Sequence, residues 1–296
     1  MPDPETSPDA RPLRSLLYMP ASNRRAIDKA RGLDTDAVAL DLEDAVAPGM
    51  KAEARAALLE ELAAGGFGHR RMIARINALA TPWGHDDLAA LAAAPVEAVL
   101  VPKVDDAEDV IALSRAMDAA GYAPGVKLWV MIETPRAVLA LERIAACAAT
   151  TRLAAFVLGL NDLAKDTGMA QLPGRAVFLP VLTLAVLAAR AHGIAILDGV
   201  CNAIDDSARL EAECVQARDG GFDGKTLIHP AQLAIANRVF APGDDAIAEA
   251  RAIVAAFADP ANAGKGALRV NGKMAELLHR TQAERLLAKA AAIAAH

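Results

Sequence analysis

Hydrophobic and polar positions along the chain form two kinds of segment that alternate. Short runs rich in Val, Ile, Leu and Ala are typical of buried strands, and a longer Ala- and Leu-rich segment with helical periodicity follows each of them. Eight successive strand–helix units predict an α/β protein whose parallel sheet closes into a (β/α)8 TIM barrel. The predicted strands lie at residues 14–20, 37–44, 71–77, 98–104, 128–134, 153–160, 195–200 and 224–229.

An open, doubly wound sheet is the alternative architecture for this pattern. No G-x-G-x-x-G motif follows the first predicted strand, and the eight units fill the chain to about residue 240. Both observations favour the barrel, which we assign to residues 13–240. Residues 1–12 are polar and rich in proline and lack the apolar core of a signal peptide, so we expect a disordered leader.

Residues 241–296 predict a C-terminal extension made of a helix, a hairpin and a second helix. The first helical segment begins at Asp244, and Asn271-Gly272 between apolar runs is a strong signal for a two-residue hairpin turn. The last helical segment begins at about Glu276. Because the extension is small, we do not assign it as a separate domain and expect it to pack on the barrel or on a neighbouring subunit.

Composition and charge narrow the possible partners and the compartment. The chain has 296 residues, of which 54% are hydrophobic, and this suits a large buried core. A net charge of −6 without any basic run, together with 3% aromatic residues, argues against nucleic acid as a partner. Three cysteines without paired spacing indicate neither disulfides nor a zinc site and fit a reducing cytoplasm. The longest apolar segment is interrupted by Arg190 and His192, so we expect no membrane span.

Nearly every predicted strand ends in polar side chains, at the end of the barrel where reacting groups lie in this architecture. Glu133 and Asp162, on adjacent strands, are candidate ligands of a divalent cation, and their oxygen donors would select Mg²⁺ or Mn²⁺. Arg75 would clamp a substrate carboxylate with two hydrogen bonds. The polar groups at the strand ends are Ser22, Asn23, Arg24, Arg25, Asp41, Glu43, Asp44, Arg75, Asn77, Lys103, Glu133, Asn161, Asp162, Asp198 and His229.

Asp41 and Glu43 share one face of their strand because side chains alternate with a period of two. They could hold water molecules bound to the metal. Each candidate also has a purely structural alternative, although the convergence of the whole set favours a functional site. The alternatives are an ion pair with Arg75 or Lys103 for Glu133, helix capping for Asp41, Glu43 and Asp44, a turn for Asp198, loop orientation for His229, and the bridging of carboxylates for Lys225.

The chain resembles the HpcH/HpaI aldolase and citrate lyase β-subunit family of CoA-ester lyases, from Arg14 to about Ala291. The final segment, NGKMAELLH, is similar to the tail of malyl-CoA lyases and malyl-CoA thioesterases. The motifs that carry the resemblance are RSLLYMPASNRRAIDKA, LDLEDAVAPGMK, RINALATPWG, VLVPKV, WVMIETPRAV, GLNDLAKD, ILDGV and GFDGKTLIHPAQ.

This resemblance implies a Mg²⁺-dependent barrel that acts on a short 3-hydroxyacyl thioester of CoA. By motif, Glu133 and Asp162 would hold the metal and Arg75 would grip the substrate carboxylate. Glu276, at a position that is often aspartate in the family, would reach the site of an adjacent subunit in a homotrimer or hexamer. The remaining predicted site residues are Asp41 and Glu43 in catalysis, and Ser22, Asn23, Arg24, Lys103 and Asp198 in binding CoA or substrate.

The implied activity is a carbon–carbon lyase. It would cleave or form malyl-, citramalyl- or citryl-CoA, with an acyl-CoA and an α-oxo acid as the other partners. One alternative is a malyl-CoA thioesterase, which would release malate and free CoA. A further alternative is a citrate lyase β-type subunit that depends on an acyl carrier protein.

Overall fold

The computed structural model describes residues 11–295, which divide into two compact units. The larger unit is Leu13–Phe240, and the smaller unit contains the chain from Ala241 onward. The disordered leader expected at residues 1–12 lies outside the described residues, apart from its last two positions. Each unit is described separately below.

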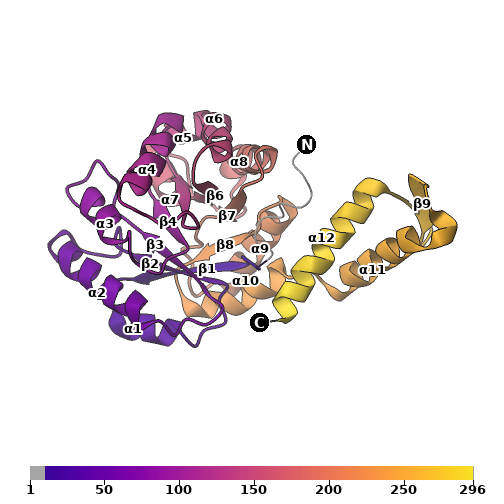
Figure 1. The fold of residues 1–296 in the computed structure, drawn as a ribbon, viewed down its shortest axis with the longest axis horizontal. Helices are drawn as coiled ribbons and strands as arrows, with labels where there is room; N and C mark the ends of the chain where they lie inside the picture. The colour runs from indigo at the N-terminus through magenta and orange to yellow at the C-terminus, as the bar shows by residue number, and fades with distance from the viewer. Residues whose placement is uncertain (1–10, 296) are drawn as a thin grey trace. The chain divides into compact units, whose positions relative to one another are not determined.

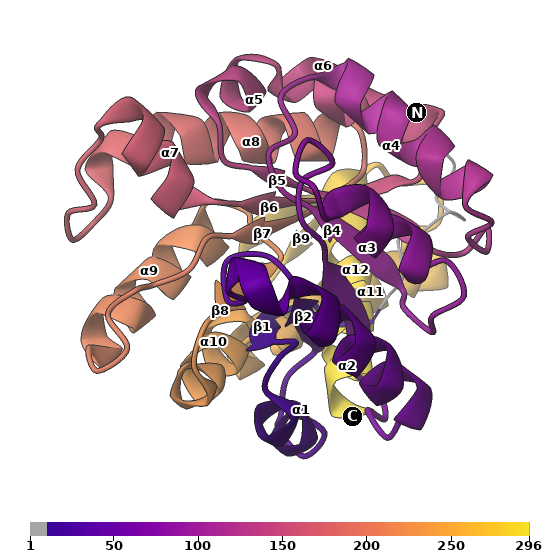
Figure 2. The ribbon, with the colours of Figure 1, turned by 90° about the vertical axis from the view of Figure 1, so that its left-hand side faces the viewer.

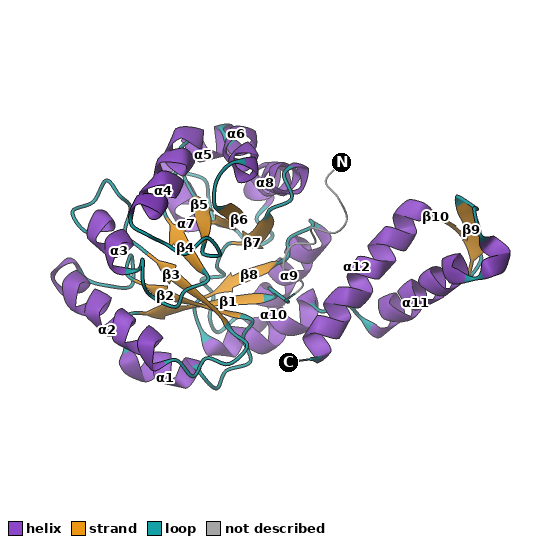
Figure 3. Ribbon diagram, viewed as in Figure 1, coloured by secondary structure: helices purple, strands orange, loops and turns teal. Residues whose placement is uncertain are grey.

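Eight parallel strands form a closed barrel in the larger unit, in the order β1 to β8, and β1 pairs with β8 to complete the ring. Figures 1 and 3 show these strands at the centre of the unit with helices outside them. The predicted (β/α)8 barrel is therefore confirmed. The strands are β1 (Ser15–Pro20), β2 (Ala37–Asp41), β3 (Arg71–Arg75), β4 (Ala98–Val101), β5 (Lys127–Ile132), β6 (Leu153–Leu158), β7 (Ala195–Asp198) and β8 (Gly224–Leu227).

Helices connect the successive strands and surround the sheet, as Figure 2 shows. Within residues 11–295, no helix combines the length and the apolar character that a membrane crossing requires. The helices of this unit are α1 (Arg24–Ala30), α2 (Lys51–Ala64), α3 (Gly84–Ala90), α4 (Ala107–Ala119), α5 (Pro135–Leu139), α6 (Leu141–Ala146), α7 (Leu160–Thr167), α8 (Leu179–Ala191), α9 (Ser207–Asp219) and α10 (Leu233–Phe240), with short 3-10 turns η1 (Pro48–Met50), η2 (Cys147–Ala149), η3 (Ala176–Phe178) and η4 (Pro230–Gln232).

The hydrophobic core of the barrel has two layers, because successive side chains of a strand point to opposite faces. Alternate residues such as Ala39, Ile73 and Met131 form a cluster inside the barrel. Their neighbours, including Leu40 and Ala74, pack against the helices in a second and larger cluster. This alternation decides which polar side chains at the strand ends point toward the barrel axis.

The smaller unit contains two helices joined by a hairpin, which confirms the predicted extension. Strands β9 (Ala267–Val270) and β10 (Lys273–Glu276) are antiparallel. Both turn residues have positive φ angles, 49° at Asn271 and 81° at Gly272, as the tight two-residue turn requires. The remaining elements are α11 (Asp244–Ala258), η5 (Pro260–Asn262) and α12 (Leu277–Ala294).

Candidate active site

The inward faces of β1, β2, β3 and β5 deliver four polar side chains to the same end of the barrel. Asp41 lies two residues after the inward-facing Ala39, and Arg75 lies two residues after the inward-facing Ile73. Asp41 and Arg75 are also direct partners in the strand register. On β1 the corresponding side chain is Tyr18, and after β5 it is Glu133. The two-residue period therefore accounts for the position of all four groups.

The sequence after β5 explains why a carboxylate stands at this point. The strand ends at Ile132, and Thr134 caps the next helix, because its hydroxyl accepts a hydrogen bond from the Ala137 N–H at 3.0 Å. Pro135 occupies the first turn of that helix, where its missing N–H costs nothing. Glu133 is thus held at the junction of strand and helix, with an exposed fraction of 1%.

Arg75 is fixed by Asp41 through two parallel hydrogen bonds. Its Nε donates to Oδ1 and its Nη2 donates to Oδ2, both at 2.7 Å. The guanidinium also lies over the Tyr18 ring, 4.7 Å from the centroid. Burial lowers the pKa of Arg75, but the charge and hydrogen bonds of Asp41 outweigh this effect, so its pKa lies well above the ordinary value. Arg75 therefore stays charged.

Glu43 stands on the other side of the same guanidinium. Its Oε2 lies 2.8 Å from Nη1 of Arg75, in a direction that does not make a hydrogen bond. Burial raises the pKa of Glu43 to about 8, against the opposing charge of Arg75. Glu43 does not line the central cavity, whereas Asp41 and Asp44 do. The structure therefore brings Asp41 and Glu43 to Arg75.

A second charged group forms around Glu133. The backbone N–H of Lys103 donates to Oε1 of Glu133 at 2.8 Å, and the Lys103 ammonium lies 3.4 Å from the same oxygen. The ammonium also pairs with Oδ1 of Asp162. Burial raises the pKa of Glu133, while the charge and N–H of Lys103 oppose this rise. The Lys103 ammonium is thus shared between Glu133 and Asp162, the two carboxylates that the sequence predicted as metal ligands.

These residues fit a hard divalent cation. The Lys103 ammonium already stands where positive charge is favoured between two carboxylates, and carboxylate oxygens suit Mg²⁺. Among residues 11–295 there is no group of three or more His, Cys, Asp or Glu side chains arranged for a metal. Glu133 and Asp162 would therefore supply two ligands, and the other positions would go to water or substrate, as is usual for Mg²⁺.

Gly159, which follows β6, leaves the space that the Glu133 side chain occupies. A Cβ at this position would lie 2.5 Å from both Cβ and Oε2 of Glu133, well inside contact distance. Only glycine lets the end of β6 approach the end of β5 so closely. Asp162 lies in the first turn of α7, immediately beyond this glycine.

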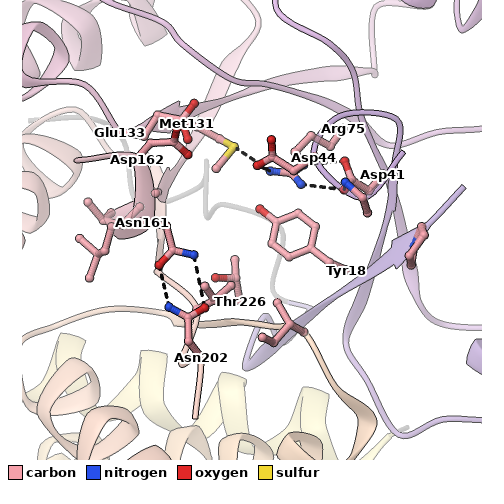
Figure 4. A pocket seen from close by; sticks show the side chains of 17 residues that line it. Tyr18, Asp41, Asp44, Arg75, Met131, Glu133, Asn161, Asp162, Asn202 and Thr226 are labelled. Carbon is pink, nitrogen blue, oxygen red and sulfur yellow. Dashed lines mark hydrogen bonds and ion pairs between the residues drawn. The ribbon is translucent and has the colours of Figure 1, made fainter. Parts of the chain in front are cut away.

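A cavity of about 320 Å³ joins the two charged groups at the centre of the barrel end. Figure 4 shows Arg75, Asp41 and Asp44 on one side, Glu133 and Asp162 on another, and Asn161 and Asn202 below them. Nδ2 of Asn202 donates to Oδ1 of Asn161 at 2.7 Å, which links α7 to the loop after β7. The lining residues are Tyr18, Pro20, Asp41, Asp44, Ala45, Arg75, Met131, Glu133, Leu158, Gly159, Leu160, Asn161, Asp162, Val200, Asn202, Thr226 and Ile228.

Three predicted binding residues line a different hollow. Ser22, Asn23 and Arg24 face a space of about 520 Å³ whose other wall is η1 and the first half of α2. The Asn23 side chain accepts a hydrogen bond from the Ala26 N–H and caps α1. Arg24 is exposed and pairs with Glu60. Ser22, Asn23 and Arg24 therefore follow the end of β1, but they do not line the central cavity.

Asp198 also lies outside the cavity. On β7 the inward residue is Leu197, so Asp198 points into the layer between strands and helices, where it is fully buried. Nη1 of Arg175 lies 2.8 Å from its Oδ1 and Nζ of Lys225 lies 2.6 Å from its Oδ2. Lys225 also lies 3.2 Å from Glu213, so it bridges two carboxylates. This network joins β7 and β8 to α9 and to the loop before η3.

Glu276 belongs to the smaller unit, at the end of β10 and the start of α12, where its N–H donates to Nδ1 of His279 at 2.9 Å. Sequence reasoning missed the cavity residues Tyr18, Met131, Asn202 and Thr226. The signal for Tyr18 was present: it follows Leu16 by two residues on β1 and so shares the inward face.

The described geometry can be compared with known proteins. The family model described as HpcH/HpaI aldolase/citrate lyase matches residues 14–230. The chain belongs to this family. The matched range covers all eight barrel strands and every charged residue of the cavity.

Two groups of relatives in this family match over nearly their whole length. A (3S)-malyl-CoA thioesterase from Cereibacter sphaeroides is 48% identical over 286 residues, covering 97% of each chain. An L-malyl-CoA/beta-methylmalyl-CoA lyase from the same species is 35% identical over 312 residues, covering 97% of this chain and 98% of the lyase.

A solved family structure extends the similarity to both units of the chain. The protein CitE from Mycobacterium tuberculosis, in complex with magnesium, acetoacetate and coenzyme A, matches with a TM-score of 0.76 and 30% identity. The match covers 96% of this chain and 99% of that one. Magnesium, a small oxo acid and a CoA molecule are thus bound by one structural relative.

Proposed function

We propose that the protein is a Mg²⁺-dependent enzyme that hydrolyses a short 3-hydroxyacyl-CoA carrying one free carboxylate, of the (3S)-malyl-CoA class. The observation that carries the proposal is the cavity with two charged walls: a pair of carboxylates sharing one cation, and a buried arginine on the other side. Hydrolysis ranks before carbon–carbon cleavage because the thioesterase relative shares 48% of its residues with this chain and the lyase relative 35%.

Glu133 and Asp162 would hold the metal, and Lys103 would leave their oxygens when it binds. When bound, Mg²⁺ would supply Lewis acidity toward an oxygen of the substrate or toward a water molecule. Arg75 would neutralise and orient the substrate carboxylate. Asp41 and Glu43 would position Arg75, since Asp41 occupies two of its donor groups and Glu43 contacts a third.

Hydrolysis requires that water adds to the thioester carbonyl and that the carbon–sulfur bond breaks. The products are free CoA, which takes up a proton at sulfur, and the hydroxydicarboxylic acid. Glu276 from an adjacent subunit would take the proton from the attacking water. The hollow at Ser22, Asn23 and Arg24 would receive the distal part of CoA.

A lyase that forms acetyl-CoA and an α-oxo acid is the second candidate. It is favoured by the full-length similarity to the malyl-CoA lyase and by a citrate lyase beta subunit from Mycobacterium tuberculosis that was solved with magnesium and the α-oxo acid oxaloacetate. The same carboxylates and arginine would serve, but the carbon–carbon bond next to the hydroxyl would break and the thioester would remain intact.

One assay separates these functions. The isolated protein is supplied with Mg²⁺ and malyl-, methylmalyl-, citramalyl- or citryl-CoA, and free thiol and α-oxo acid are measured separately. We expect free thiol and malate in equal amounts from malyl-CoA, without glyoxylate. Glyoxylate and acetyl-CoA without thiol would instead identify a lyase, and no turnover of any of the four would refute both assignments. Turnover by the isolated protein would exclude dependence on an acyl carrier protein, and Glu133→Gln provides the metal-site control.

A further inference from the structure

Asp41 already occupies one of the two edges by which Arg75 could grip a substrate carboxylate with a pair of parallel hydrogen bonds. That geometry needs one free edge of the guanidinium, and the edge formed by Nε and Nη2 is occupied by Asp41 at 2.7 Å for each bond. The remaining nitrogen, Nη1, lies 2.8 Å from Oε2 of Glu43 and 3.8 Å from the sulfur of Met131, a residue of the cavity wall. A carboxylate bound in the cavity can therefore reach Arg75 only through Nη1 and the second N–H of Nη2, and a further donor beside them would strengthen its binding.

Tyr18 offers such a donor. Its ring lines the cavity and lies under the guanidinium of Arg75, 4.7 Å from ring centroid to the guanidinium carbon. Figure 4 shows the ring beside Arg75 and Asp44, with the hydroxyl directed toward the interior of the cavity. The hydroxyl is buried, and no group of the described residues forms a hydrogen bond with it. A buried hydroxyl without a partner is unfavourable and rare in native proteins.

The protonation state of Tyr18 suits a donor. Burial raises the pKa of the phenol well above its ordinary value, so the O–H is intact at neutral pH. A neutral donor beside a permanent cation is a favourable environment for one carboxylate, since each oxygen obtains a hydrogen bond and the charge is neutralised once.

We infer that the Tyr18 hydroxyl donates a hydrogen bond to the carboxylate of the acyl group, next to Arg75, and so selects thioesters that carry this carboxylate. The inference rests on the proposed function for the class of substrate. Tyr18 is the substrate contact, and Asp41 holds Arg75 beside it through the Nε–Nη2 edge.

The chain contains a matched control. It has two tyrosines, and the other one, Tyr122, donates its hydroxyl hydrogen to the Leu88 carbonyl at 2.7 Å, away from the cavity. Tyr18→Phe removes a hydroxyl without a protein partner, so the metal-free variant should unfold at the same temperature as the wild type or higher. Tyr122→Phe leaves a buried carbonyl without its donor and should lower the unfolding temperature.

The test measures binding of two ligands by calorimetry in the presence of Mg²⁺. L-Malate carries the carboxylates of the proposed product, and 3-hydroxybutyryl-CoA has the thioester and hydroxyl but no free carboxylate. We expect Tyr18→Phe to weaken L-malate binding about tenfold or more, as loss of a hydrogen bond to a charged group implies. Binding of 3-hydroxybutyryl-CoA should change less than about twofold on the same scale. Tyr122→Phe should change neither dissociation constant.

Steady-state kinetics give a second readout. For malyl-CoA, Tyr18→Phe should raise KM by a similar factor and lower kcat much less, because the contact is made in the bound ground state as well as in the transition state. Unchanged L-malate affinity in Tyr18→Phe, equal weakening for both ligands, or failure of the wild type to bind L-malate would each overturn the inference. A wild type that binds L-malate but does not turn over malyl-CoA would count against the proposed function alone, because the binding test remains valid.

Discussion

Lys103 contacts Glu133 through two different groups. Its backbone N–H donates to Oε1 at 2.8 Å, and its ammonium lies 3.4 Å from the same oxygen. Lys103 has a φ angle of 57°, in the left-handed region that residues other than glycine and asparagine rarely adopt. The loop after β4 thus accepts an unfavourable backbone conformation while presenting one donor and one positive charge to the proposed metal ligands.

The ammonium of Lys103 should compete with a divalent cation for Glu133 and Asp162. Lys103→Asn removes the charge and tolerates the positive φ, so we expect the metal-free protein to unfold at lower temperature and the Mn²⁺ affinity to rise about tenfold. Calorimetry or Mn²⁺ electron paramagnetic resonance measures the affinity. Two variants serve as controls. Lys103→Arg keeps the charge at this position, and Lys165→Asn removes a charge from an exposed position of α7. Equal Mn²⁺ affinity in Lys103→Asn and wild type would contradict the competition.

Gly159→Ala should abolish the metal site without unfolding the barrel. The new Cβ would lie 2.5 Å from Oε2 of Glu133, so this carboxylate must leave its present position. We expect Mn²⁺ binding to weaken about a hundredfold or more, since displacement of a ligand by even one ångström is costly in such sites. Gly125→Ala is the control, because nothing lies within 4 Å of its added Cβ. Wild-type Mn²⁺ affinity in Gly159→Ala would refute the role of Glu133 as a ligand.

Arg75→Lys should raise the KM for malyl-CoA about tenfold or more and leave the Mn²⁺ affinity nearly unchanged. Lysine cannot make the two parallel bonds that Arg75 forms with Asp41, so its charge would no longer be held at the cavity wall. Arg115→Lys, at an exposed position of α4, is the control. If KM is the same in Arg75→Lys and wild type, Arg75 does not contact the substrate.

Glu43 should make the stability of the metal-free protein depend on pH. Burial raises its pKa to about 8 from an ordinary value of 4.5, so the folded state keeps a proton that the unfolded state has lost between these two values. The free energy of unfolding must therefore fall as pH rises through this window. Between pH 4.5 and pH 8, the free energy of unfolding of the wild type should fall by about 2–5 kcal/mol more than that of Glu43→Gln.

Urea unfolding at several pH values measures this dependence. Glu53→Gln, at an exposed position of α2, should leave the pH profile of the wild type unchanged. Parallel profiles for the wild type and Glu43→Gln would show that Glu43 is ionised normally in the folded state.

Glu276 provides a test of assembly. If it acts on the site of an adjacent subunit, Glu276→Ala and Glu133→Gln homo-oligomers are each inactive, but a mixture refolded together contains some sites with both residues intact. Random mixing of equal amounts in a cyclic oligomer would restore about a quarter of the sites. Activity of the mixture is compared with that of each variant alone, and the oligomer size is measured by light scattering. A mixture as inactive as its components would show that Glu276 does not act across subunits.

The sequence alone determined the strands, the helices and the end of the barrel at which the polar side chains gather. Strand and helix periods predicted eight strands and the closed barrel, and Asn271-Gly272 predicted the hairpin, because these signals are local. The two-residue period also explains why Asp41, Arg75 and Glu133 lie on inward faces, although the sequence predicted only that Asp41 shares a face with Glu43. Applied to β7, the same rule predicts that Asp198 points outward with Ile196. Applied to β1, it predicts that Tyr18 points inward with Leu16.

The tertiary structure decided which of these groups pair with one another. Strand register sets Asp41 beside Arg75, and this pairing occupies one edge of the guanidinium that the sequence assigned to the substrate carboxylate. The loop conformation at Lys103 gives Glu133 and Asp162 a shared cation, and Arg175, from a distant loop, completes the buried network at Asp198. Periodicity specifies the face on which a side chain lies, whereas its partner depends on register and loop geometry, which arise only when segments far apart in the chain pack together.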